Sequence, residues 1–262
     1  MIRLRQPMKK INKHKSKLFK LSTVKSLHKW LSLLVFIQLF IWLGTGLFFN
    51  LMDHNKARGN HNKQTVVTQQ IDSQRLLNSN SIIAKSNTQV SEVVLVQRLG
   101  QPYYLLTHDK GLYSHFKSDY SLVDAYAGTE LVVDSNVASR LAQASYKGSG
   151  DISGVVKLEP PIADMLKEKN TVWQVNFSDD LETSVYVDAS SGRLVGHSNE
   201  DKRFVDFFFM LHFMDYPFLG EGSVGGFNNG QITFFALLTL AFCLTGFIWV
   251  IELLRKGRYK FN

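Results

Sequence analysis

The chain has 262 residues, with 30 Lys and Arg against 22 Asp and Glu, a formal net charge of +8, and a single Cys. The first 29 residues carry ten Lys or Arg and no acid, and four more cations follow residue 254. Without these fourteen cations and Glu252, the middle of the chain has sixteen Lys and Arg and twenty-one Asp and Glu, so it is mildly acidic. This distribution excludes a nucleic-acid-binding body, and the lone Cys excludes a disulfide framework.

The first apolar segment, LHKWLSLLVFIQLFIWLGTGLFF, covers residues 27–49 and has no charge from Trp30 to Phe49. Such a run of about 20 residues forms a helix of about 30 Å, the thickness of the hydrocarbon core of a bilayer. A secretory signal has a shorter apolar core, so the segment predicts a retained transmembrane helix over 27–52. The polar residues 53–70 then form a tether, with a strand expected over 65–68.

A second uncharged run of similar length, QITFFALLTLAFCLTGFIWVI, predicts a transmembrane helix over 231–252. A basic, partly amphipathic N-terminus (1–26) and a basic tail (253–262) flank the two spans. Because flanks rich in Lys and Arg stay in the cytoplasm, both termini are predicted to be cytoplasmic. Cys243 lies within the second span, so packing alone must hold the region between the spans together.

The region between the spans contains an internal repeat. Four landmarks occur twice in the same order, at offsets of 62 to 69 residues, which indicates a duplication. Each copy begins with Asp-Ser, a helix N-cap signal, and the sequence predicts one helix and three or four antiparallel strands in each of two units, 71–132 and 133–200. The repeated segments are IDSQRLLNSNSIIAKS and VDSNVASRLAQAS, VVLVQ and VVKLE, PYYLLTH and TVWQVNF, and VDAYAGTELV and VDASSGRLV.

Turn chemistry is the predicted role of the Asp and Gly residues that recur in each copy. The segments 124–128 and 188–192 each start with Asp and end with Gly, which is typical of a turn whose Gly adopts the left-handed conformation. Alternation in SVYVDASSGRLVGH places Val185 and Val187 on one face of a strand. We interpret these Asp residues as turn residues and not as calcium ligands or catalytic groups.

The unit that ends in YVDASSGRLVG resembles a PepSY domain, and LHKWLSLLVFIQLFIWLGTGLFF resembles the first helix of the PepSY-associated transmembrane proteins. LHFMDYPFLGEGSVGGFNNGQITFFALLTLAFCLTGFIWV is similar to that family's His-bearing surface segment, Gly-rich turn and later helix. The resemblance covers residues 27–256, and Ser32 stands where the family pattern has Gly. It implies an α+β membrane protein in which two transmembrane helices flank two helix-plus-antiparallel-sheet units, with an interfacial amphipathic segment and Gly-rich turn over 201–230.

The resemblance also implies a location and a function. Membrane-bound relatives pass electrons across the bacterial inner membrane, some through haem b, and include ferrisiderophore reductases, whereas PepSY modules elsewhere act on peptidases. This chain has no Rossmann-like Gly motif and no Cys-x-x-Cys, so we do not expect it to be an enzyme on its own. The first hypothesis is an inner-membrane accessory with a periplasmic body that serves electron transfer or iron and siderophore reduction beside a partner membrane reductase.

A transmembrane haem b needs two axial His ligands that face each other across one iron. Of the eight His residues, only His28, His54 and His212 lie next to a predicted membrane segment. Unbroken helix separates His28 from His54 by about 39 Å, so these two cannot share one haem. His54 and His212 are the candidate pair, within one chain or across a dimer, with Asp215 near enough in sequence to orient His212. His28 would need a partner from another subunit.

The second hypothesis involves no redox chemistry. An exposed sheet edge in the repeat can receive a peptide, a peptidase or another envelope protein by strand addition. His54 and His61, with Asp53, are interpreted as part of a solvated tether and not as a metal site. Small and polar residues within the spans, such as Gly44 and Gln38, suit close helix packing, so contact with lipid and a homodimer of four helices are expected.

Overall fold

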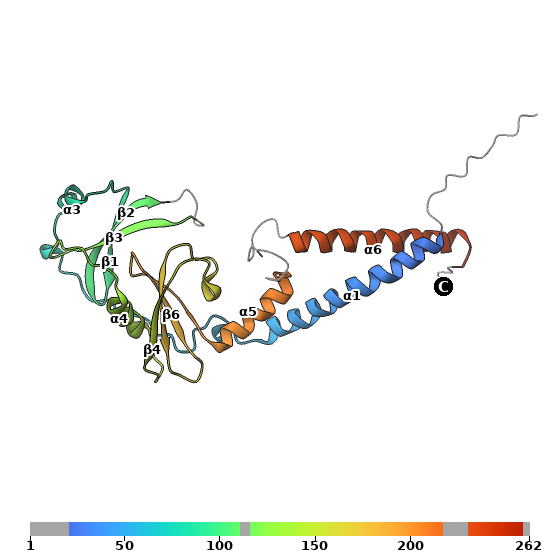
Figure 1. Ribbon diagram of the computed structural model, residues 1–262, viewed down its shortest axis with the longest axis horizontal. Coiled ribbons are helices and arrows are strands. Elements are labelled where there is room, and N and C mark those ends of the chain that lie inside the picture. Colours follow the sequence, from blue (N-terminus) through green and yellow to red (C-terminus); the bar gives the residue numbers. More distant parts are fainter. Residues whose placement is uncertain (1–20, 111–115, 217–229, 259–262) are drawn as a thin grey trace, which may run out of the picture. The chain divides into compact units, whose positions relative to one another are not determined.

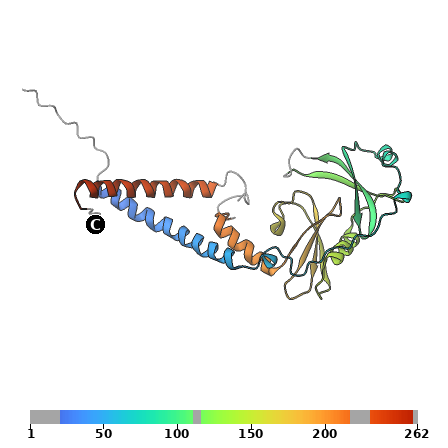
Figure 2. The ribbon, with the colours of Figure 1, turned by 180° about the vertical axis from the view of Figure 1, so that it is seen from behind.

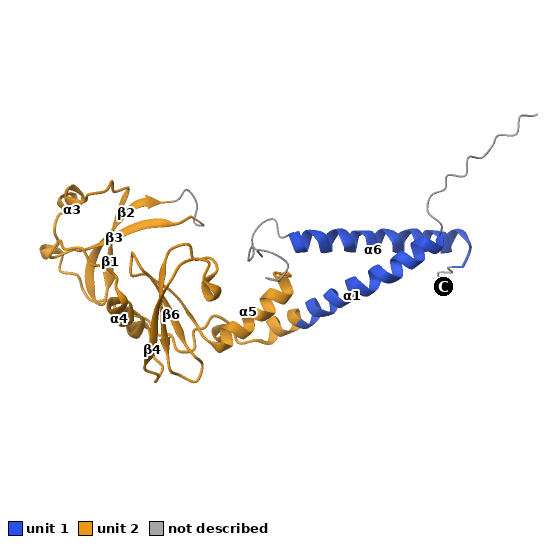
Figure 3. Cartoon of the chain, in the orientation of Figure 1, with its two compact units in different colours: residues 1–44, 227–262 blue, residues 45–226 orange. Residues whose placement is uncertain are grey.

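The computed structural model describes residues 21–110, 116–216 and 230–258 (Figure 1). The chain divides into two compact units, one of residues 1–44 and 227–262 and one of residues 45–226 (Figure 3). The predictions for most of the basic N-terminus, for the Gly-rich turn and for the end of the basic tail fall on residues 1–20, 217–229 and 259–262, outside the described residues.

Two long apolar helices form the first unit. They are α1 (Leu21–Leu51), whose last turns belong to the second unit, and α6 (Gly230–Arg255). Both are long and apolar enough to cross a membrane. Large apolar side chains along them are exposed, among them Phe40 at 67 % and Phe234 at 67 %, as expected for helices that contact lipid. The two predicted spans and the membrane character of the chain are confirmed.

The tether after α1 is mostly irregular. It contains the short helix α2 (His54–Ala57), whose N-cap is the side chain of Asp53, and an isolated β-bridge between Lys63 and Tyr146. The strand expected over 65–68 is not formed. Val67 is 80 % exposed, so no burial of its side chain compensates the loss of backbone freedom that a strand would require.

The first copy of the repeat is a three-stranded antiparallel sheet with one short helix. Its core forms where Ile82 of the helix meets Tyr104 and Leu106 of the central strand. The strands follow the order β1-β2-β3, so each neighbouring pair is a hairpin. The elements are α3 (Ser79–Lys85), β1 (Glu92–Arg98), β2 (Gln101–Lys110) and β3 (Ser118–Asp124).

The helix of this first copy begins later than the sequence predicts. Asp72 caps only the single 3-10 turn η1 (Ser73–Arg75), and Asn78 caps α3. Between them the backbone of Leu76 is extended, and the side chains of Leu76 and Leu77 both pack against the core. Two adjacent apolar residues cannot lie on the same narrow face of a helix, so the chain stays extended there.

The second copy is a four-stranded antiparallel sheet with a longer helix, seen from behind in Figure 2. Asp134 caps this helix as predicted, because its carboxylate accepts a hydrogen bond from the Val137 N–H. The helix buries Leu141 against Val185 and Val187, the two residues predicted to share a face. The elements are α4 (Ser135–Ser145), β4 (Ile152–Leu158), β5 (Val172–Phe177), β6 (Ser184–Asp188) and β7 (Leu194–Ser198), in the order β4-β5-β6-β7.

The repeated turns have the predicted conformation. Gly128 has φ +70° and Gly192 has φ +61°, both in the left-handed region that favours Gly. Asp124 and Asp188 accept hydrogen bonds from backbone N–H groups two and three residues further on. Together with the two sheets and the two long helices, these turns confirm an α+β membrane protein.

Helix α5 (Glu200–Phe213) follows the second copy directly. The side chain of Asn199 caps its first turn by accepting a hydrogen bond from the Lys202 N–H, and Met214 ends it in the left-handed conformation. Several large rings on α5 are exposed, among them Phe204 at 56 %, which suits a helix beside a membrane surface. This helix supplies one wall of the cavity described next.

Candidate functional site

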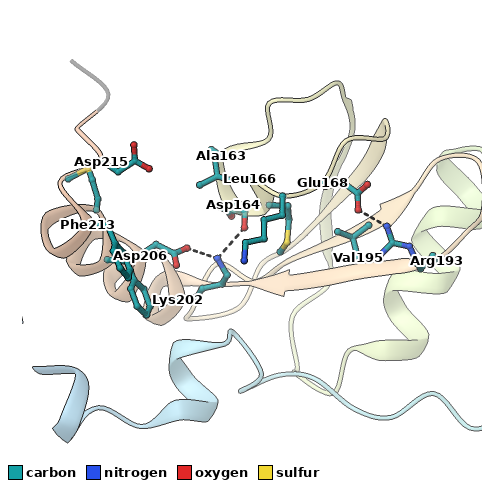
Figure 4. A pocket seen from close by; sticks show the side chains of 14 residues that line it. Ala163, Asp164, Leu166, Glu168, Arg193, Val195, Lys202, Asp206, Phe213 and Asp215 are labelled. Carbon is teal, nitrogen blue, oxygen red and sulfur yellow. Dashed lines mark hydrogen bonds and ion pairs between the residues drawn. The ribbon is translucent and has the colours of Figure 1, made fainter. Parts of the chain in front are cut away.

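A cavity of about 860 Å³, here named the α5 pocket, lies in the second unit between the loop with the 3-10 helix η2 (Ala163–Met165), strand β7 and helix α5 (Figure 4). Its volume is within the range of pockets that hold small ligands. The described residues that line it are Ala163, Asp164, Met165, Leu166, Lys167, Glu168, Arg193, Val195, Lys202, Asp206, Phe209, Met210, Phe213 and Asp215.

The half of the α5 pocket beside the C-terminal end of α5 is mainly apolar. Phe213 is four residues after Phe209 and three after Met210, so its side chain lies next to both on the helix surface and the three form one wall. Met side chains are flexible and polarizable, so such a wall adapts to ligands of different shape. The η2 loop and β7 add Met165, Leu166 and Val195.

The other half of the α5 pocket carries ion pairs. Lys202, in the first turn of α5, pairs with Asp206 and donates a hydrogen bond to the backbone oxygen of Asp164 at 3.1 Å (Figure 4). Arg193 pairs with Glu168 at the far end of the pocket (Figure 4). Asp164 and Lys167 also line the pocket, so cations and anions occur together and their charges largely balance.

Asp164 holds the η2 loop against α5. Its carboxylate accepts hydrogen bonds from the Tyr186 hydroxyl at 2.9 Å and from Arg203 Nε at 3.2 Å. Burial alone would raise the pKa of Asp164, but hydrogen bonds and the Arg203 charge outweigh it and lower the pKa. Burial and the neighbouring Asp164 charge raise the pKa of Tyr186. At neutral pH the pair is a carboxylate and a neutral phenol, so the loop stays fixed.

Asp215 lies just beyond α5, at the apolar end of the pocket. Its Oδ1 is buried and has no hydrogen-bond partner among the described residues. Burial raises the pKa of this carboxyl. Asp215 can therefore accept a hydrogen bond from a ligand, and it makes no described hydrogen bond to His212.

His212 lies between α5 and the last turns of α1. Its Nδ1 is 2.8 Å from Thr45 Oγ1, and its ring meets Phe49 edge-on with centroids 5.3 Å apart. One turn earlier on α5, Phe208 stacks on Phe48 with centroids 4.1 Å apart. Later residues of α5 thus meet earlier residues of α1, so the two helices are antiparallel, and His212 is placed at the level of Thr45.

His54 is exposed at the start of α2, and the structure does not bring it to His212. Helix α1 continues for six residues beyond Thr45, about 9 Å, before the chain reaches His54. Because α1 and α5 are antiparallel, the C-terminal end of α1 lies beside the N-terminal end of α5. His54 follows that end of α1, whereas His212 is near the C-terminal end of α5. Haem ligation by His54 and His212, within one chain or between two copies, stays a prediction.

His28 takes part in the packing of α1 against α6 within the first unit. Its Nδ1 is 3.1 Å from Thr245 Oγ1 and 3.2 Å from the backbone oxygen of Phe242, and the two rings stack with centroids 4.6 Å apart. A Cβ at Gly246 would lie 2.9 Å from His28 Cε1, so Gly is what lets the imidazole fit. These contacts give His28 a structural role, and a haem ligand role for it stays a prediction.

The sheet edge expected to receive a peptide is available at β4. This strand ends the four-stranded sheet, and its apolar side chains Ile152 and Val156 are 37 % and 48 % exposed. A β-bulge between Ile152 and Gly154 twists the strand, a feature that commonly protects edges from pairing. The α5 pocket is the better-formed site, because it encloses volume and combines apolar and charged walls.

Most of the α5 pocket has no signal in the sequence. Its walls come from three segments, around residues 165, 194 and 206, and of these three the sequence predicts an amphipathic segment only at the last, within 201–230. The aromatic and Met spacing on α5 marks one wall, yet nothing local to Asp164 indicates that it fixes the loop opposite. The spacing of apolar residues three and four apart on α5 is the one local signal for this wall.

Residues 25–262 match the sequence model of a family described as PepSY-associated TM region. The match covers α6, all but the first turn of α1, and the whole body between them. Neither the curated proteins nor the solved structures contain a significant match to the chain.

Proposed function

The chain belongs to the PepSY-associated TM family, and we propose that it is a membrane-anchored binding module whose body captures a peptide or envelope protein in the α5 pocket. In this proposal the body lies in the periplasm and both termini lie in the cytoplasm, because cationic flanks border the two spans. Helices α1 and α6 then keep the body at the bacterial inner membrane.

The α5 pocket itself carries the proposal, because a cavity of about 860 Å³ joins an apolar wall to two ion pairs. Apolar side chains of a ligand gain free energy by leaving water, and the charged half fixes the ligand's orientation. The described lining contains no Ser, Cys or His. Its Lys and Arg residues include two held in ion pairs, so the arrangement suits recognition better than nucleophilic or general-base chemistry.

Truncating Phe213 tests whether the α5 pocket binds ligand. The probes are fluorescein-labelled peptides, each with one Leu, Phe or Met between Lys and Asp. We expect Phe213→Ala to weaken their binding by roughly tenfold. Fluorescence anisotropy with the full chain in nanodiscs measures this. Phe207→Ala is the matched control, since Phe207 is 51 % exposed and Phe213 is 48 % exposed, but only Phe213 lines the pocket. Equal affinities for both variants would reject the pocket as the binding site.

Electron transfer through haem b stays a second candidate. The hydrogen bond between the Thr45 hydroxyl and His212 Nδ1 fixes the orientation of that imidazole, as second-shell partners do for metal-bound His. A Soret band in the protein purified in mild detergent, lost in His212→Ala and kept in His108→Ala, is the result expected if His212 holds haem. A colourless protein that incorporates no added haemin would remove this candidate.

A further inference from the structure

The C-terminal end of α5 lies at the depth of lipid chains. Thr45, which meets His212, is four residues before Phe49, the last apolar residue of α1 before the polar Asn50. At 1.5 Å per residue, Thr45 is about 6 Å inside a run whose length matches the hydrocarbon core. The end of α5 with Phe213 is therefore level with the acyl chains of the leaflet from which the body emerges.

The polarity of the α5 pocket follows the same direction. Its mainly apolar half, with Phe209, Met210 and Phe213, is the half at lipid depth, and the ion pairs of Lys202 and Arg193 lie toward the body (Figure 4). A ligand that enters from the membrane would thus meet apolar walls first and charged side chains last. This order suits an amphiphile whose apolar part stays near the bilayer.

The apolar half accepts an acyl chain more readily than a peptide. A peptide carries an N–H and a C=O at every residue, and leaving them unpaired away from water is costly. The wall of Phe209, Met210 and Phe213 offers no N–H, hydroxyl or carboxylate side-chain group, and Asp215 beside it offers one carboxyl. An unbranched acyl chain has no such groups, and flexible Met side chains conform to it.

The charged half of the pocket favours an acylated peptide over a phospholipid, although both molecules carry an acyl chain. The charged lining residues include the carboxylates of Asp164, Glu168 and Asp206 as well as the cations of Lys167, Arg193 and Lys202. The phosphate of a phospholipid would meet both signs, so part of the lining repels it. A peptide carries donors, acceptors and charges of both signs, which match the mixed pairs. We propose, resting on the proposed binding function, that the α5 pocket holds the acyl chain of a lipid-anchored envelope peptide or protein, with the peptide at the ion-paired end.

The first test compares two peptides that differ only in the acyl group. Palmitoyl-Gly-Ser-Lys-Asp-Ala and acetyl-Gly-Ser-Lys-Asp-Ala are titrated against the full chain in nanodiscs. We expect the palmitoyl peptide to bind nanodiscs that contain the protein at least about tenfold more tightly than empty nanodiscs. We also expect it to bind the protein more tightly than the acetyl peptide does, by a similar factor. We expect Met210→Gln to abolish this preference, whereas Phe207→Gln, a change on α5 outside the pocket lining, leaves it intact.

The second test locates the chain and does not depend on a variant. A palmitoyl peptide with a diazirine near the end of its acyl chain is photolysed on the wild-type protein, and the adducts are mapped by mass spectrometry. We expect adducts on Met165, Leu166 or Val195, which belong to the body and not to the spans. Adducts confined to α1, α6 and the exposed ring of Phe207 would overturn the proposal.

The remaining outcomes separate this inference from the proposed function. Equal, pocket-dependent affinity for both peptides would leave the binding function standing and reject the acyl chain as ligand. A diazirine phosphatidylethanolamine that labels the same three residues as strongly as the palmitoyl peptide would make the occupant a phospholipid and overturn the choice of a peptide. Binding unaffected by both Met210→Gln and Phe213→Ala would reject the binding function and the inference together.

Discussion

Asp188→Ala is expected to lower the free energy of unfolding by about 3 kcal/mol. Asp188 is fully buried, and its carboxylate accepts hydrogen bonds of 2.8–3.0 Å from the backbone N–H groups of Ser190 and Ser191, the Ser190 hydroxyl and the Asn170 amide. Burial alone would raise the pKa of Asp188, but these hydrogen bonds outweigh it and lower the pKa. Removing the carboxylate leaves several buried donors without an acceptor, which is the costly case.

The first copy of the repeat contains the matched control. Asp124 occupies the same place in its turn and accepts hydrogen bonds from two backbone N–H groups, but it is only half-buried. We expect Asp124→Ala to cost about 1 kcal/mol, because water can replace the lost acceptor. Urea unfolding in mild detergent, followed by circular dichroism, compares the two variants. Equal losses would mean that burial of the network contributes nothing.

The turns show how much the sequence alone can predict. A turn depends on the conformational freedom of Gly and on hydrogen bonds to residues two or three positions away, so both Gly128 and Gly192 were predictable. The two spans were predictable for the same reason, since length and the absence of charge are properties of a continuous segment. The different burial of Asp124 and Asp188 depends on contacts with distant segments, and the equivalent sequences carry no sign of it.

The helices of the two copies show where a local signal fails. Both copies offer an Asp-Ser N-cap, but only the second continues with small and apolar residues three and four positions apart, so that Ala138, Leu141 and Ala142 are buried together. In the first copy Leu76 and Leu77 are adjacent, and the core takes both by keeping the backbone extended. In the first copy the spacing of the buried residues, and not the Asp72 N-cap, decides where the helix begins.

The α5 pocket was beyond prediction for a related reason. Lys202 and Asp206 form a pair one turn apart that the sequence permits, but Asp164 joins them from 38 residues away. No pattern in the η2 loop specifies that contact. The candidate His residues, in contrast, were chosen by their position near the spans, and the structure gives two of them, His28 and His212, packing partners on neighbouring helices.

Acidification from pH 6.5 to pH 4 is expected to destabilise the body by about 3 kcal/mol through one residue, His197. His197 is 3 % exposed, and its Nε2 lies 3.0 Å from the Ser145 hydroxyl. Burial, with a smaller effect of the Lys63 charge, lowers the pKa of His197 to about 4. Between pH 6.5 and 4 the unfolded chain binds a proton at this residue and the folded chain does not. The free energy of unfolding therefore falls as the pH decreases through this range.

His197→Gln isolates this contribution, because Gln can keep the hydrogen bond to Ser145 and does not titrate. We expect its free energy of unfolding to change far less between pH 6.5 and 4 than that of the wild type. Urea unfolding followed by tryptophan fluorescence measures this, since one of the four Trp residues, Trp173, lies in the body. Carboxylates with a lowered pKa, such as Asp179, lose their stabilising effect only as the pH falls below about 4, outside this range. The same pH dependence in both proteins would place the titrating group elsewhere in the body. A difference confined to this range would show that the folded body keeps the imidazole of His197 neutral. The tether covers this residue closely, since a Cβ at Gly59 would lie 2.7 Å from the backbone oxygen of His197.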